Sequence, residues 1–186
     1  MLSGRVETNG CKESSMASLI ENLIMTLEQE SELYELLTKE SMDKTAVIVS
    51  NDLNRLSEAN EREQRIVDDI TSVSHKRNQA LQEIATVLGK DANTITVSEV
   101  IQLMAKQPEF QHPLIAIRDR LLKQTEVLKQ VNIHNQSLLK ESLEMTEYSI
   151  NLIQSMNQAP ETANYNKGNY SGATLGGNYS SFDAKQ

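Results

Sequence analysis

Apolar residues recur at helical spacing along three long stretches of the chain. The first stretch runs from about Ala17 to Val49, the second from about Leu53 to Leu88, and the third from about Pro113 to Met156. In each, apolar positions repeat at intervals of three, four and seven, which places them on one face of an α-helix. The pattern therefore predicts three amphipathic helices that pack against one another along these faces.

Polar residues and glycine at the ends of these stretches predict where the helices begin and end. Ser18, with a glutamate three residues later, fits a capping box at the start of the first helix. Asn51-Asp52 suits a break and a new helix cap, although a break near Asp43 is an alternative. Gly89 suits the end of the second helix, because glycine readily adopts the left-handed conformation found there.

The connection over residues 90–112 predicts a short fourth helix. Thr96 and Glu99 fit a capping box. Pro108 and Pro113 then bracket a turn, and Pro113 suits the first position of the third long helix. We expect this insert to cover the end of the bundle; a dedicated binding site is the alternative.

The second helix carries two charged residues close to its apolar stripe. Glu63 and Arg77 are 14 residues apart, which corresponds to roughly 21 Å along a helix axis. They are therefore too far apart to pair with each other.

The third helix has an interrupted apolar seam. Its N-terminal half is well supplied with aliphatic residues, whereas its C-terminal half alternates polar residues with methionine. A helix built only to fill a core does not normally place amides and hydroxyls along its seam. We interpret the interruption as a surface that holds a partner reversibly; homo-oligomeric packing is the alternative. The seam at intervals of seven reads Leu114, Leu121, Leu128, Asn135, Ser142, Ser149 and Met156.

Composition narrows the class of protein. Hydrophobic residues make up 38% and aromatic residues 4% of the 186-residue chain, which fits an elongated helical protein better than a globule with a deep core. The net charge of −8 argues against nucleic acid as a partner. No apolar stretch approaches the roughly 20 residues needed to cross a bilayer, so we expect no membrane insertion. The single cysteine, Cys11, cannot form an internal disulfide, and the expected location is the cytoplasm.

No group of residues indicates catalysis or a bound metal. His75, His112 and His134 are far apart and lack neighbours at metal-site spacing. The glycines near the C-terminus do not lie between a strand and a helix, so no phosphate-binding loop is expected. The sequence indicates a binding protein that is not an enzyme and needs no cofactor.

Both ends of the chain lack helical periodicity. Residues 1–15 carry two glycines and are expected to be a disordered extension; a functional start at Met16 is the alternative. Residues 159–186 are rich in Gly, Asn and Tyr and cannot bury enough apolar area to offset the entropy of ordering. The expected organisation is therefore a helical domain over 16–158 between two disordered ends. The predicted fold is all-α: an elongated, antiparallel, coiled-coil-like three-helix bundle with a short capping helix.

Two segments resemble the FlgN family of flagellar type III export chaperones. Residues 132–144 (NIHNQSLLKESLE) are similar to that family's C-terminal helix, and residues 34–70 (YELLTKESMDK…RIVDDI) are similar to its first hairpin. The resemblance in layout covers about residues 17–157. It implies a cytoplasmic chaperone that binds hook–filament junction (hook-associated) proteins. Such a chaperone prevents their premature assembly and delivers them to the export apparatus.

The resemblance also implies where partners bind. Cargo is expected on one face of the third long helix. The cytosolic domain of the export gate is expected to bind the C-terminal region; an inert solvated tail is the alternative. A structural coiled-coil protein that self-associates through the same seam, as a homo-oligomer, is the alternative. The implied cargo-binding residues are Asn135, Leu138, Leu139, Ser142, Met145, Leu152 and Ile153. The implied gate-docking residues are Tyr148, Tyr165, Tyr170, Tyr179 and Phe182.

Overall fold

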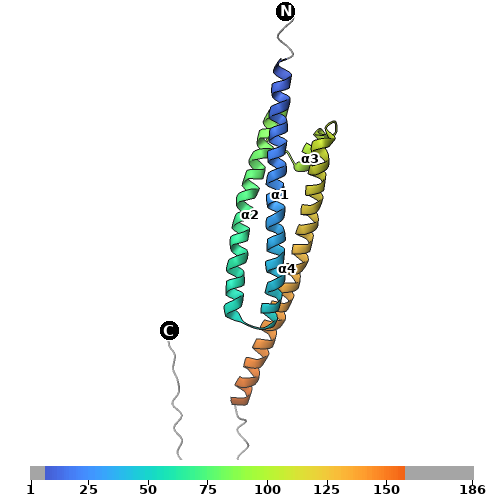
Figure 1. Ribbon diagram of the computed structural model, residues 1–186. Coiled ribbons are helices and arrows are strands. Elements are labelled where there is room, and N and C mark those ends of the chain that lie inside the picture. The colour runs from blue at the N-terminus through green and yellow to red at the C-terminus, as the bar shows by residue number, and fades with distance from the viewer. Residues whose placement is uncertain (1–6, 158–186) are drawn as a thin grey trace, which may run out of the picture. The chain divides into compact units, whose positions relative to one another are not determined.

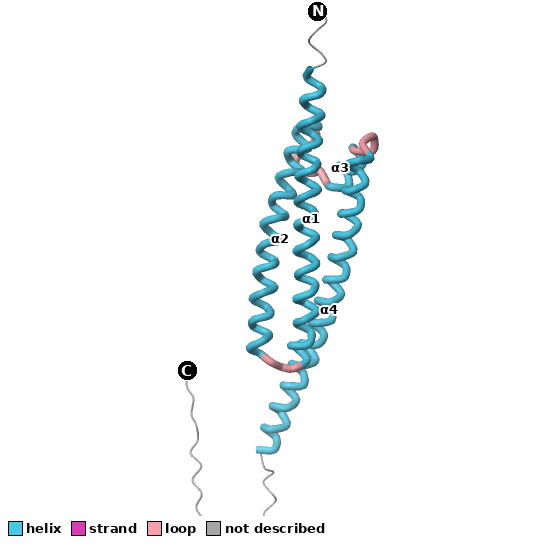
Figure 2. Tube along the Cα trace, viewed as in Figure 1, coloured by secondary structure: helices cyan, strands magenta, loops and turns pink. Residues whose placement is uncertain are grey.

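A computed structural model describes residues 7–157 of the chain, with side chains described from residue 15 onward. These residues form four helices, α1 (Glu7–Val49), α2 (Leu53–Leu88), α3 (Val97–Leu103) and α4 (Pro108–Asn157), joined by short loops (Figures 1 and 2). The described part contains no strand. The predicted all-α helical bundle is thus confirmed. The chain divides into two compact units, Met1–Glu147 and Tyr148–Gln186.

Helix α1 begins earlier than the sequence predicted. It starts at Glu7 rather than near Ala17, so the predicted cap at Ser18 is wrong and part of the expected disordered extension is helical. Met16 packs against the core, which gives the helix a tertiary contact upstream of Ser18. No break occurs near the alternative position, because α1 continues to Val49.

The predicted cap and stop of α2 are confirmed. The Asp52 side chain accepts a hydrogen bond from the backbone N–H of Arg55 at 3.1 Å, and the preceding Asn51 adopts a φ of 56° in the turn. Gly89 has a φ of 64°, and the N–H of Lys90 donates to the carbonyl of Ala85 at 2.8 Å. This is the Schellman arrangement, in which a residue with positive φ ends a helix.

Helix α3 forms with the predicted capping box. The Thr96 hydroxyl accepts from the N–H of Glu99, and the Glu99 carboxylate accepts from the N–H of Thr96. Val100 and Ile101 are buried and join the core of the first unit. The interpretation of this insert as a packed cap is therefore confirmed.

Helix α4 begins at Pro108 and not, as predicted, at Pro113. Pro108 occupies the first helical position, where its missing N–H costs nothing. Phe110 packs against the core, so the extra turn is held by tertiary contacts. The helix accommodates Pro113 close to its start, at the expense of one backbone hydrogen bond.

Buried apolar side chains form two clusters in the first unit. The larger cluster joins α1, α2, α3 and the start of α4, and the smaller joins the three long helices further along. Leu114 and Leu128 of the predicted α4 seam are buried in these clusters, as expected. The larger cluster contains Ile20, Leu23, Leu27, Ala80, Leu81, Ile84, Val100, Ile101, Met104, Leu114 and Ile117. The smaller contains Leu37, Ile66, Ile70 and Leu128.

Candidate functional site

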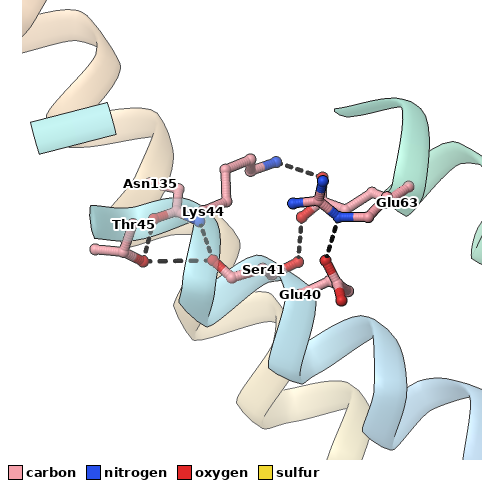
Figure 3. A network of polar contacts seen from close by, with 7 residues as sticks. Glu40, Ser41, Lys44, Thr45, Glu63 and Asn135 are labelled. Atoms are coloured by element: carbon pink, nitrogen blue, oxygen red, sulfur yellow. Dashed lines mark hydrogen bonds and ion pairs between the residues drawn. The ribbon is translucent and has the colours of Figure 1, made fainter. Parts of the chain in front are cut away.

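Asn135 joins α4 to α1 inside the bundle. Its side chain is 3% exposed. The amide nitrogen donates to the backbone carbonyl of Ser41 at 2.8 Å, and the amide oxygen accepts from the Thr45 hydroxyl at 2.7 Å (Figure 3). Both halves of the amide are therefore occupied within the chain. The resemblance implied a cargo contact at Asn135, but this residue faces the bundle interior.

A network of polar contacts extends from Asn135 through α1 to α2. The Ser41 hydroxyl donates to the Glu63 carboxylate at 2.6 Å, and the same carboxylate pairs with Lys44 (Figure 3). This network links three helices through one buried serine. It also supplies the partner of Glu63 that the sequence could not identify.

Two further side-chain hydrogen bonds connect α4 to α1 and the turn that follows it. The Ser31 hydroxyl donates to the Gln124 side-chain oxygen at 2.8 Å, and the Ser142 hydroxyl donates to the Asn51 side-chain oxygen at 2.6 Å. Together with Asn135, these contacts show that polar residues of the predicted seam bind partners within the chain. Ser142 is half-buried, so it too belongs to the bundle.

The remaining predicted cargo residues of the first unit differ in exposure. Leu138 and Leu139 are half-buried, whereas Met145 is 73% exposed. Leu143, which the sequence analysis did not single out, is also largely exposed. Of these side chains, Met145 and Leu143 present the most surface.

The last ten described residues of α4, Tyr148–Asn157, lie in the second unit and are all exposed. This segment, YSINLIQSMN, contains no charged residue, although charged residues make up 24% of the chain. Its five large apolar side chains are between 47% and 73% exposed. They include the predicted residues Tyr148, Leu152 and Ile153, together with Ile150 and Met156.

We call Tyr148–Asn157 the neutral segment of α4, because it contains no charged residue. Ile150 was missed as a candidate because the predicted cargo residues came from the family resemblance, which did not include it. The signal that identifies it is the absence of charge, since a helix face meant for water normally carries charged residues.

A buried ion pair lies between α1 and α2. The Glu30 side chain is 2% exposed, and Arg77 contacts both of its carboxylate oxygens, at 2.6 and 2.7 Å. Arg77 also donates to the Ser74 hydroxyl at 2.9 Å. The sequence placed Arg77 near the apolar stripe of α2, and the structure identifies Glu30 as the group that neutralises it.

Tyr34 lines the same groove as this ion pair. Burial raises the pKa of the Tyr34 phenol above its ordinary value of 10.0, the Glu30 carboxylate adds to the rise, and the Arg77 guanidinium opposes it.

Because its folded-state pKa is raised, Tyr34 contributes stability that is complete below pH 10 and is lost as the pH rises through the folded-state value. We expect Tyr34→Phe to weaken the decline of the unfolding free energy above pH 10. Urea denaturation between pH 8 and pH 11 measures this decline, with Tyr148→Phe on the exposed neutral segment as the matched control. An unchanged decline in Tyr34→Phe would contradict the assignment.

The other predicted docking residues cannot be placed. Tyr165, Tyr170, Tyr179 and Phe182 lie outside the described residues. Across residues 7–157, no three His, Cys, Asp or Glu side chains gather as they would around a metal ion. No helix in this part of the chain is long and apolar enough to cross a membrane.

Residues 7–157 form an all-α helical-bundle protein in which the last described turns of α4 expose large apolar side chains. The model of the FlgN protein family matches residues 16–171. The chain therefore belongs to the FlgN family, whose members are flagellar export chaperones. Comparison with curated proteins and with solved structures found no match in either set.

Proposed function

We propose that this protein is a cytoplasmic chaperone for hook-associated junction proteins. It binds them before export, prevents their premature assembly, and delivers them to the cytosolic domain of the flagellar type III export gate. The observation that carries this proposal is the neutral segment of α4 in a member of an export-chaperone family. An amphipathic helix of the cargo would cover its apolar side chains.

The energetics of the neutral segment suit reversible binding. Complete burial of a large apolar side chain contributes about 1.5–3 kcal/mol, and these side chains are already partly covered. Part of the gain is offset by the loss of translational and side-chain freedom on association. Met145 and Met156 are both 73% exposed, and their flexible thioether side chains would adapt to related cargo surfaces.

Contacts and exposure guide which of the predicted residues we keep in the proposed cargo surface. Asn135 and Ser142 bond within the bundle, so we leave them out of the proposed surface. Met145, Leu152 and Ile153 remain in it. Tyr148 also remains as a candidate contact for either cargo or the export gate.

A double substitution on the neutral segment tests this function. Leu152→Asp with Ile153→Asp places two charges among exposed apolar side chains, and we expect cargo affinity to fall by about 100-fold or more, since burying unpaired charge is costly. Isothermal titration calorimetry with a purified hook-associated protein measures the affinity. Asn151→Asp with Gln154→Asp is the matched control, because it adds the same charge at polar positions of the same segment. Equal affinity losses in the two variants would refute the proposed surface.

The alternative function is structural self-association through α4. It is favoured by the same apolar side chains, which a second copy could cover. Light scattering of the free protein separates the two functions. If Leu152→Asp with Ile153→Asp dissociates a homo-oligomer and the wild-type protein binds no cargo, the structural function is correct.

A further inference from the structure

The attachment of α4 to the rest of the first unit changes along the helix. Near its start, Leu114 and Ile117 are buried in the larger cluster, and Leu128 is buried in the smaller one. Beyond Leu128, the one buried residue in the described part of α4 is Asn135, which is polar. From there to Glu147 the helix is held by side-chain hydrogen bonds and by apolar side chains that are at most half-buried.

The hairpin of α1 and α2 has polar contacts of its own at the level of Asn135. The Ser41 hydroxyl donates to the Glu63 carboxylate, and Lys44 pairs with the same carboxylate (Figure 3). Arg62 also pairs with Glu40 across the two helices. These contacts join α1 to α2 without any contribution from α4.

The charged residues of α4 do not attach it to this hairpin. In the part of the chain that the structure describes, the ion pairs of α4 lie within the helix, between Arg118 and Asp119 and between Lys140 and Glu144. Residues 114–147 contain neither glycine nor proline, and these are the residues at which helices commonly kink. This part of α4 can therefore tilt as one rod about its buried start.

The groups that α4 contacts beyond Leu128 keep other partners when it moves away. The Thr45 hydroxyl already lies 3.4 Å from the Ser41 carbonyl oxygen, and the Ser41 hydroxyl stays on Glu63. Asn51, the partner of Ser142, is exposed in the turn and accessible to water. Hydrogen bonds to water replace those that are lost, so the net loss per bond is modest.

We propose that residues 129–147 of α4 form a latch that tilts away from the α1–α2 hairpin while the larger cluster stays closed. Regions with few buried apolar contacts open more readily than the core. The half-buried Leu138 and Leu139 favour the closed state, and opening exposes them together with Asn135. Opening therefore controls access to this face of α4. The inference rests on contacts inside the first unit and does not depend on what α4 binds.

Hydrogen exchange of the wild-type protein tests the opening. A helix detached from its neighbours is marginally stable in water, since packing supplies most helix stability in proteins, so the amides of the latch exchange once it opens. After correction for intrinsic rates, we expect residues 131–147 to exchange at least about tenfold faster than residues 114–128. Residues 59–70 of α2 are the control at the same end of the bundle, and they are expected to exchange as slowly as residues 114–128.

Two outcomes of this measurement overturn the proposal. If residues 131–147 exchange as slowly as residues 59–70, α4 remains attached along its whole length in the first unit. If residues 59–70 exchange as fast as residues 131–147, this end of the bundle opens as a whole and there is no separate latch.

A matched pair of substitutions on α1 tests what holds the latch. Thr45→Val removes the hydroxyl that donates to Asn135, whereas Thr38→Val removes one that donates to the Tyr34 carbonyl within α1. We expect Thr45→Val to accelerate exchange over residues 131–147 by about fivefold or more, because the closed state then buries an unsatisfied acceptor. Exchange over residues 114–128 is expected to stay unchanged. An effect no larger than that of Thr38→Val, or equal acceleration over residues 114–128, would contradict a latch held by this contact.

Discussion

Replacing Arg77 by methionine is expected to lower the free energy of unfolding by about 3–5 kcal/mol, because it leaves a carboxylate buried without its partner. The Glu30 side chain is 2% exposed and receives both of its ion-pair contacts from Arg77. Urea denaturation at pH 7, followed by circular dichroism, measures the loss.

Two further variants show that the loss comes from the unpaired charge. Changing Glu30 and Arg77 to methionine together removes both charges, and replacing a buried pair by apolar residues of similar size is often neutral or stabilising. Arg62→Met breaks the more exposed pair with Glu40 and is expected to change the free energy of unfolding little, because solvent screens exposed ion pairs. If Arg77→Met lowers the free energy of unfolding no more than Arg62→Met does, the buried pair contributes no more to stability than the exposed pair, and the prediction is wrong.

The change of Asn135 to aspartate is expected to lower the free energy of unfolding by about 2–4 kcal/mol, because it turns a buried donor into a buried negative charge. The Asn135 amide nitrogen donates to the Ser41 carbonyl. An aspartate oxygen at that position faces the carbonyl oxygen and is repelled by it. Of the two groups that contact Asn135, only the Thr45 hydroxyl can still donate a hydrogen bond to the aspartate.

Leucine at the same position is the informative control. The Thr45 hydroxyl already lies 3.4 Å from the Ser41 carbonyl oxygen, so it retains an acceptor when the amide is removed. Asn135→Leu therefore leaves no polar group without a partner and is expected to cost less than about 1 kcal/mol. Hydrogen exchange over residues 131–147 measures how firmly α4 is held, and it should accelerate in the aspartate variant alone. Equal acceleration in both variants would show that packing volume matters at this position rather than hydrogen bonding.

Helix identity and helix ends were largely predictable because their causes are local. Periodicity located the long helices, and the cap at Asp52, the stop at Gly89 and the capping box at Thr96 all formed. The predicted starts of α1 and α4 were wrong. Packing of Phe110 against the core holds the extra turn of α4, and packing of Met16 holds α1 upstream of Ser18. Neither contact is visible in the local sequence.

The candidate site was predictable only in part. The sequence drew attention to α4 and to Leu152 and Ile153, and the structure places both on the exposed neutral segment. It also nominated Asn135 and Ser142, which bond inside the bundle. A polar residue on an apolar seam has the same sequence pattern whether its partner is another protein or a neighbouring helix.

The sequence alone determined which residues share a helix face, where most helices end, and which family the chain resembles, because spacing, capping chemistry and motifs are properties of neighbouring residues. Tertiary structure alone decided which residue lies opposite which. Asn135 and Ser41 are 94 residues apart in the chain, and Arg77 and Glu30 are 47 apart. Helical periodicity specifies a direction around one axis but not the alignment of one helix along another. It also cannot distinguish an apolar face that has found a neighbour from one that is still open to a partner.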